Sequence, residues 1–263
     1  MALFGQVHDA DVGTLGPEHP DTLTTLNNLA LAYKDAGRTA EAITLFQEVL
    51  QWRRENLGAD HPFVLVTLDG AARSHAEAED FARALELHGR AAEGVKQREF
   101  LTAKAGHIVE NLSELLERLG RYDQAETWRR EWLAALEEIR GSSSAEYAEQ
   151  LAMLAHNLLE RDQVTEAEKL LREAVQISDQ LELTADTPYA SVGPMATSLL
   201  GQALPEQQQA DQAAPLLSSA YEKLQSLADT PPSNVRHRKL RTRRLSEASD
   251  RLSAYHARTD QPQ

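Results

Sequence analysis

Residues 16–50 read GPEHPDTLTTLNNLALAYKDAGRTAEAITLFQEVL, and this stretch decides the fold. It holds two runs of apolar residues at spacings of three and four: Leu26, Leu29 and Tyr33, then Leu45, Phe46 and Val49. Such spacing places each run on one face of a helix. Gly37 lies between the runs and suits a helix C-cap followed by a tight turn. The stretch therefore predicts two amphipathic helices, over 20–35 and 39–56.

The same pattern returns at shifts of 42, 83, 125 and 171 residues. Small residues recur in the first helix of each unit, at Ala30, Ala72, Ser113, Ala155 and Gly201. Alanines recur in the second helix, at Ala42, Ala84, Ala125, Ala167 and Ala213. These positions mark close helix crossings, where a larger side chain would cost about 1–3 kcal/mol. The regular spacing indicates a repeat array.

The first unit resembles the tetratricopeptide repeat, whose pattern is Leu-Gly-x-x-Tyr, then Ala, then Phe. Leu29, Ala30, Tyr33, Ala42 and Phe46 occupy those slots, and the resemblance covers roughly residues 16–228. The long period and the Gly-x-x-His-Pro linkers resemble the kinesin-light-chain type. The resemblance implies an all-α fold, a right-handed α-solenoid of antiparallel helix pairs. The second unit departs from the pattern at three slots, which hold His75, Glu79 and His88.

The pattern divides the chain into three parts. Residues 1–15 form a half-repeat or an N-terminal cap helix, residues 16–228 form five helix pairs, and residues 229–263 form a basic C-terminal cap helix and tail. The expected pairs are 20–35 with 39–56, 62–77 with 80–97, 100–118 with 122–139, 145–160 with 164–181, and 189–204 with 209–228. A long polar helix over 233–257 echoes the first helix of a sixth unit.

The first fifteen residues match a second helix rather than a first one. At a shift of 42, Leu3, Phe4 and Val7 fall on Leu45, Phe46 and Val49. A second helix without its first helix leaves an apolar face open, whereas solenoids normally cap their ends. The sequence is consistent with a fragment of a longer protein, and also with a capping helix that evolved from a half-repeat.

Composition excludes several classes of function. The 263 residues carry a net charge of −14, which disfavours nucleic acid or an anionic membrane as the main partner. The absence of cysteine excludes disulfides, thiolate zinc sites and thiol nucleophiles. No apolar run approaches the ~20 residues that cross a bilayer, and no secretory signal is visible. By default these features predict a cytoplasmic protein.

No catalytic or cofactor motif is present. The nine histidines include no His-Glu-x-x-His, and His19 and His61 are linker residues before prolines. Residues 142–144, three serines, suit a helix N-cap better than a nucleophile elbow. No glycine-rich phosphate loop occurs. Trp132 falls in a packing slot equivalent to that of Val49. We therefore expect no metal, no cofactor and no enzymatic activity.

The resemblance places a peptide-binding groove on the concave face, which the first helices line. The positions expected on or beside its floor are Asn27, Asn28, Leu31, Lys34, Asp69, Arg73, His107, Glu110, Asn111, Glu114, Glu117, Glu149 and His156. This floor is mildly basic at its N-terminal end and acidic in the middle. Asn28 and Asn111 are expected to hydrogen-bond a peptide backbone.

The segment from Arg236 to Arg244 is the one basic run of the chain. Three roles fit it: a solvated helix face, a contact with the acidic body or with an acidic partner, and, with least support, nucleic-acid binding.

Two functions follow from these patterns. The main expectation is a non-catalytic scaffold that binds a peptide or protein segment of unidentified sequence in the groove. The alternative is a regulatory repeat region of a larger bacterial serine/threonine kinase or signalling protein, because residues 160–175 resemble repeats that accompany such kinases. The kinase motifs themselves are absent from these 263 residues.

Overall fold

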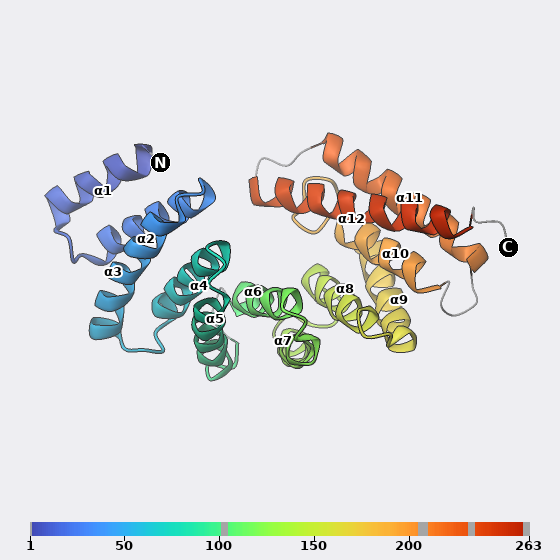
Figure 1. Ribbon diagram of the computed structural model, residues 1–263, viewed down its shortest axis with the longest axis horizontal. Coiled ribbons are helices and arrows are strands. Elements are labelled where there is room, and N and C mark those ends of the chain that lie inside the picture. The colour runs from blue at the N-terminus through green and yellow to red at the C-terminus, as the bar shows by residue number, and fades with distance from the viewer. Residues whose placement is uncertain (1, 101–104, 205–209, 231–234, 260–263) are drawn as a thin grey trace. The chain divides into compact units, whose positions relative to one another are not determined.

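The computed structural model describes residues 2–100, 105–204, 210–230 and 235–259. Over these ranges the chain forms helices and no strand, so the fold is all-α (Figure 1). It divides into two compact units, residues 1–125 and 126–263, and each is described by itself.

The first unit begins with the single helix α1 and continues as helix pairs. Its helices are α1 (Ala2–Leu15), α2 (Pro20–Asp35), α3 (Thr39–Leu57), α4 (Pro62–Glu77), α5 (Phe81–Lys96) and α6 (Ala105–Arg118). Each helix packs on the next one, and the first helices α2, α4 and α6 also pack on one another in that order. The helix α7 (Tyr122–Arg140) spans the boundary between the units.

The second unit repeats this arrangement (Figure 1). Its helices are α8 (Ala145–Leu159), α9 (Val164–Gln180), α10 (Val192–Ala203), α11 (Ala210–Asp229) and α12 (Val235–Thr259). The first helix α10 packs on both α8 and α9, and α12 packs on both α10 and α11. The described helices thus follow one another from α1 to α12, while the division into five helix pairs and a cap helix stays a prediction.

The small residues of the repeat lie at the helix crossings. Ala30, Ala72, Ser113 and Ala155 have no exposed surface, and Gly201 is buried. All five alanines of the second helices are likewise fully buried. Trp132 is buried as its packing slot predicts. The repeat pattern therefore predicts which residues are buried, because small residues at the crossings let the helices approach closely.

The turn within each pair needs a left-handed residue. Gly37 supplies it in the first pair with φ +76°, and the next amide, Arg38 N, donates to Tyr33 O at 2.9 Å. In the second pair Glu79 takes the same conformation with φ +60°. The turn therefore forms without glycine in the second pair, although a residue with a Cβ is strained in the left-handed conformation.

The linker histidines cap the first helices. The ring nitrogen Nδ1 of His19 accepts from Asp21 N at 3.2 Å, and that of His61 accepts from Phe63 N at 3.2 Å. Ser144 caps α8 in the same way, since its Oγ accepts from Tyr147 N at 3.2 Å. These contacts confirm the structural role predicted for the histidines and for the serine segment.

Two expected helix starts are wrong. Phe100 does not open a helix, because it is left-handed with φ +56° and its amide donates to Val95 O to close the turn after α5. The fifth first helix begins at Val192 rather than 189, since Val192 N donates to Tyr189 O in a turn. Pro205, which precedes the second helix of that pair, lies outside the described residues.

The basic run binds the chain itself at two positions. The guanidinium of Arg241 is buried and donates to the backbone oxygens of Leu227, Thr230, Ala185 and Thr187. Arg244 is also buried and reaches α8 and the start of α10. Arg238, Lys239 and Arg243 are exposed, whereas the side chain of Arg236 lies outside the described residues. Of the three roles considered, an intramolecular contact holds for the two buried arginines.

Candidate functional site

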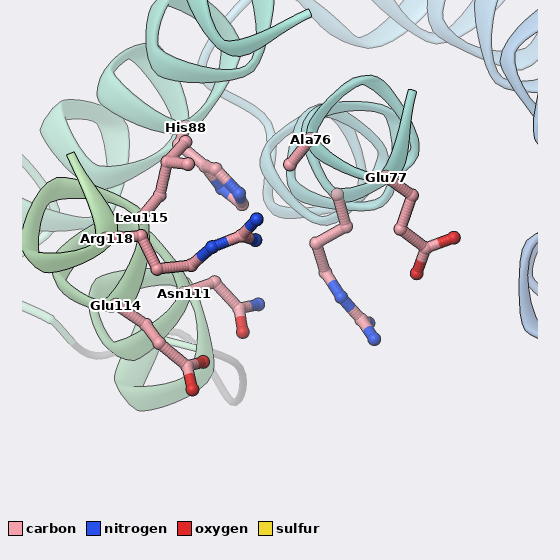
Figure 2. A pocket seen from close by; sticks show the side chains of 8 residues that line it. Ala76, Glu77, His88, Asn111, Glu114, Leu115 and Arg118 are labelled. Carbon is pink, nitrogen blue, oxygen red and sulfur yellow. The ribbon is translucent and has the colours of Figure 1, made fainter. Parts of the chain in front are cut away.

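A pocket of about 250 Å³ opens in the first unit between α4, α5 and α6 (Figure 2). Its lining comprises Arg73, Ala76 and Glu77 of α4, His88 of α5, and Asn111, Glu114, Leu115 and Arg118 of α6. Two of its three helices are first helices, so the pocket lies among the predicted groove positions. Arg73 and Glu114, predicted for the groove floor, and Asn111, predicted beside it, meet here.

Two guanidinium groups line this pocket without a carboxylate partner among the described residues: those of Arg73 and Arg118. Arg118 stacks over the ring of Phe81, with its Cζ 5.5 Å from the ring centroid. Arg118 extends from α6 toward the helix that carries Ala76 (Figure 2). A guanidinium has five donors that match a carboxylate or phosphate, so this pair is suited to an anionic group.

A buried carboxylate organises the wall of the pocket. Asn111 Nδ2 donates to both oxygens of Asp69 at 3.0 Å. His88 Nδ1 lies 3.1 Å from Asp69 Oδ1, a contact that becomes an ion pair only when His88 is protonated. His88 is buried and occupies the slot that holds Phe46 in the first repeat. Asp69 and Asn111 therefore face each other rather than a ligand, and they tie α4 to α6.

The lysine predicted to make the groove basic is buried instead. Lys34 Nζ lies 2.7 Å from Asp35 Oδ1 and 3.2 Å from Glu77 Oε1, and its side chain is 4% exposed. The two carboxylates neutralise its charge. The N-terminal end of the floor is therefore less basic than its sequence suggests, and its remaining positive charge comes from the half-buried Arg73.

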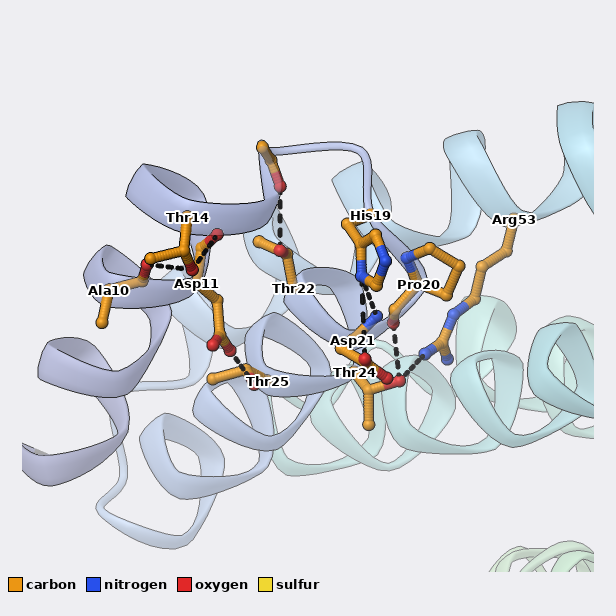
Figure 3. Close-up of polar contacts among 11 residues, drawn as sticks. Ala10, Asp11, Thr14, His19, Pro20, Asp21, Thr22, Thr24, Thr25 and Arg53 are labelled. Atoms are coloured by element: carbon orange, nitrogen blue, oxygen red, sulfur yellow. Dashed lines mark hydrogen bonds and ion pairs between the residues drawn. The ribbon is translucent and has the colours of Figure 1, made fainter.

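Other floor positions of the first repeat connect neighbouring helices. Asn27 is buried and its Oδ1 accepts from Thr67 of α4 at 3.4 Å. Arg53 of α3 donates to Thr67 Oγ1 at 2.7 Å and to Thr24 Oγ1 at 3.3 Å (Figure 3 shows the latter). Burial without a carboxylate lowers the pKa of Arg53 to about 10. Asn28 is exposed and Leu31 half-buried.

The acidic residues of α6 lie on one side of that helix. Glu110, Glu114 and Glu117 are spaced by four and three residues, and Glu114 is exposed. His107 Nδ1 lies 3.5 Å from Glu110 Oε2. These three glutamates, the α6 acidic stripe, border the pocket at Glu114.

The two floor positions of the second unit differ from each other. Glu149 accepts a hydrogen bond from Arg244 of α12, so its carboxylate already binds a side chain of the protein. His156 is partly exposed, and its Nε2 lies 3.9 Å from Glu160 Oε1. These residues belong to a different unit from the pocket.

The sequence prediction missed His88, Arg118 and Glu77 as lining residues. A signal existed for His88, because a histidine in a phenylalanine slot is unusual in this pattern. Arg118 carried the weaker signal of standing one turn after Glu114. Glu77 carried none, since a first helix commonly ends with charged residues.

Two classes of site find no support in the described part of the chain. Within it, no three His, Cys, Asp or Glu side chains come together in a way that would hold a metal ion. None of its helices combines the length and the apolar character that crossing a membrane requires.

Family models described as tetratricopeptide repeat match the chain over residues 2–51 and 21–97, and over 148–181. No curated protein matches its sequence. The crystal structure of BtubC (BKLC) from P. vanneervenii is similar, with a TM-score of 0.73 at 18% identity, covering 89% of this chain and 92% of that one.

Two further solved structures share the fold. The TPR-like repeats of a kinesin light chain homologue from Podosopora anserina give a TM-score of 0.64 at 21% identity, covering 78% of this chain and 96% of that one. YrrB, described as a TPR protein with an unusual peptide-binding site, gives 0.50 at 14% identity, covering 84% and 91%. The family models and the buried alanines show tetratricopeptide repeats over residues 2–97 and 148–181, and the solved structures share the helical-repeat fold.

Proposed function

We propose that this chain is a non-catalytic scaffold that binds a peptide segment of a partner protein along its first helices, with an acidic side chain of that segment in the Arg73–Arg118 pocket. Tetratricopeptide repeats generally mediate protein–protein interaction, and YrrB carries a peptide-binding site on the same fold. Fold alone does not choose a ligand, so the proposal rests on the chemistry of the pocket.

The observation that carries the proposal is the pair of guanidiniums without carboxylate partners. Of the carboxylates at the pocket, Asp69 contacts Asn111 and His88, Glu77 contacts Lys34, and Glu114 of the α6 acidic stripe borders it. A pocket of about 250 Å³ accepts a carboxylate-bearing side chain without displacing a wall helix. Charge-assisted hydrogen bonds to such a carboxylate contribute about 1.5–3 kcal/mol each.

The α6 acidic stripe favours a peptide that also carries a basic residue. A basic residue of the ligand, next to its acidic one, would lie against Glu110, Glu114 and Glu117. Because these glutamates are at least partly exposed, salt would screen their attraction over a Debye length near 10 Å at 0.1 M. The expected ligand is therefore a segment of mixed charge rather than a uniformly acidic or basic one.

A peptide array tests both requirements with the full chain. Wild type should retain peptides that pair an acidic with a basic residue. Arg73→Gln with Arg118→Gln should weaken binding of those peptides at least tenfold, the equivalent of 1.4 kcal/mol. Glu114→Lys with Glu117→Lys should instead select against the basic residue and reduce the salt dependence.

The matched control is Arg83→Gln with Arg90→Gln. Both arginines are exposed on α5 and lie near Glu86, so this variant has the same charge change away from the pocket. Equal affinity and salt dependence in wild type, control and pocket variant would refute the proposal.

The predicted cytoplasmic location and the alternative role beside a bacterial kinase domain stay predictions. The sequence that adjoins this chain in its gene would decide the latter.

A further inference from the structure

The pocket between α4, α5 and α6 offers more hydrogen-bond donors than a carboxylate can use. Arg73 of α4 and Arg118 of α6 both line it, and two guanidiniums together present about ten N–H donors. A carboxylate has two oxygens, and a single guanidinium can bind both of them through two parallel hydrogen bonds. A ligand group with more acceptor oxygens therefore fits this pair of arginines better.

A buried imidazole forms part of the same wall. The side chain of His88 is 2% exposed, and its ring is directed toward the space that Arg118 also faces (Figure 2). Its Nδ1 is buried and lies 3.1 Å from Asp69 Oδ1 without forming a hydrogen bond. A buried polar atom of this kind needs an explanation, because the equivalent slot of the first repeat holds the apolar Phe46. Packing alone therefore does not account for a histidine at this position.

Protonation gives His88 a second role. Both nitrogens of an imidazolium donate, so Nδ1–H can meet Asp69 while Nε2–H is left for a group in the pocket. Arg73 and Arg118 oppose the added positive charge, whereas Asp69 and an anion bound between the two arginines favour it. The more negative that anion is, the more it favours the protonated imidazole. A multiply charged anion can thus gain a third cationic donor.

The carboxylates at the pocket leave this place to a ligand. Both oxygens of Asp69 accept from Asn111, and Glu77 is paired with Lys34. Glu114 is exposed at the border of the pocket, so salt and water screen its repulsion of a bound anion.

We propose that the acidic side chain bound in this pocket is a phosphorylated serine or threonine, with its phosphate between Arg73 and Arg118 and with His88 donating to a third oxygen. This inference rests on the proposed function and names the chemical class of its ligand. A phosphate monoester carries a charge of about −1.5 to −2 at pH 7 and three strong acceptor oxygens. Clusters of arginine are a recurring means of recognising phosphorylated segments.

Three labelled peptide libraries test the proposal with the full chain by fluorescence anisotropy. The central residue of each library is phosphoserine, glutamate or serine, one neighbouring residue is lysine, and the remaining positions vary. Wild type should bind the phosphoserine library about tenfold more tightly than the glutamate library, because it forms more charge-assisted hydrogen bonds. The serine library should bind most weakly, and inorganic phosphate in excess should displace the phosphoserine library.

Two variants separate charge from geometry. Arg73→Lys with Arg118→Lys keeps both charges but removes the planar forks, so most of the preference for phosphoserine should be lost. His88→Phe places in α5 the residue type of the equivalent slot in α3, and Asp69 keeps its bonds to Asn111. This variant should lower the phosphoserine-to-glutamate ratio at least threefold and leave glutamate binding unchanged. Circular dichroism checks that both variants fold, and Arg83→Gln with Arg90→Gln should keep the wild-type ratio.

The outcomes distinguish this inference from the function on which it rests. If glutamate binds as tightly as phosphoserine, and both depend on Arg73 and Arg118, the phosphate assignment is overturned while the proposed function stands. If the binding of neither library depends on the two arginines, the proposed function fails and this inference fails with it. An unchanged ratio in His88→Phe would overturn the third contact.

Discussion

Arg244 of α12 donates to Glu149 of α8, which lies 95 residues earlier in the chain. The guanidinium is almost fully buried and also donates to Ser191 Oγ at 2.7 Å, just before α10. One arginine therefore ties α12 to two successive first helices of the second unit. Because the pair is mostly buried, removal of one partner leaves a poorly solvated charge.

We expect the contributions of Arg244 and Glu149 to the free energy of unfolding to be strongly coupled. Glu149→Leu and Arg244→Met should each destabilise the protein, by about 3 kcal/mol, because each strands the other charge. The double variant should cost clearly less than the sum, with a coupling of about 1–3 kcal/mol. Urea unfolding monitored by circular dichroism measures the four free energies. Arg243→Met, an exposed neighbour, is the control and should change stability little. Additive costs would show that the pair contributes no coupling.

A second prediction concerns Arg241, which donates to two backbone oxygens that precede α10, one in the last turn of α11 and one just after that helix. Arg241→Met keeps most of the side-chain volume but leaves those oxygens without this donor. We expect a loss of about 2–4 kcal/mol, since hydrogen bonds from a charged group contribute about 1.5–3 kcal/mol and some oxygens will gain water. Arg238→Met, on the exposed side of the same helix, should stay within about 0.5 kcal/mol of wild type. Equal unfolding midpoints for the two variants would contradict this account.

A third prediction compares two asparagines at equivalent repeat positions. Asn111→Ala removes the amide that donates to both oxygens of the buried Asp69, and should cost about 1–3 kcal/mol. Asn28→Ala changes the equivalent, exposed position of the first repeat and gains the same helix propensity. Thermal unfolding of both variants isolates the hydrogen bonds, and a smaller loss for Asn111→Ala than for Asn28→Ala would exclude the proposed role.

The parts of the fold that repeat could be predicted from the sequence. Ala30, Ala42 and their equivalents are buried because the same helix crossing recurs at each unit, so local periodicity identifies them. Glu79 kept the turn without glycine, because the surrounding helices impose its conformation. The repeated pattern therefore predicts the buried core even where one position departs from the pattern.

The site was less predictable because side chains there pair across repeats. Lys34 and Asn27 have the spacing of floor residues, but that offset also faces the next first helix, where they are buried. Glu149 has the same spacing and is taken by Arg244, which no local pattern connects to it. Arg73 is half-buried in the pocket wall, and its neighbours Asp69 and Glu77 have other partners. Which floor position is available to a ligand thus depends on contacts distant in sequence.

The last prediction tests the helix crossings on which the fold depends. Ala167 is fully buried on α9, where a longer side chain has no free volume. Ala167→Leu should destabilise the protein by about 1–3 kcal/mol through overpacking. Ala82→Leu makes the same change at an exposed position of α5 and, with nearly the same helix propensity, should have little effect. A lower urea midpoint for Ala167→Leu, with the same dependence of the unfolding free energy on urea concentration, would show that only stability changed. A neutral Ala167→Leu would mean that the small residue of the repeat is not required by packing.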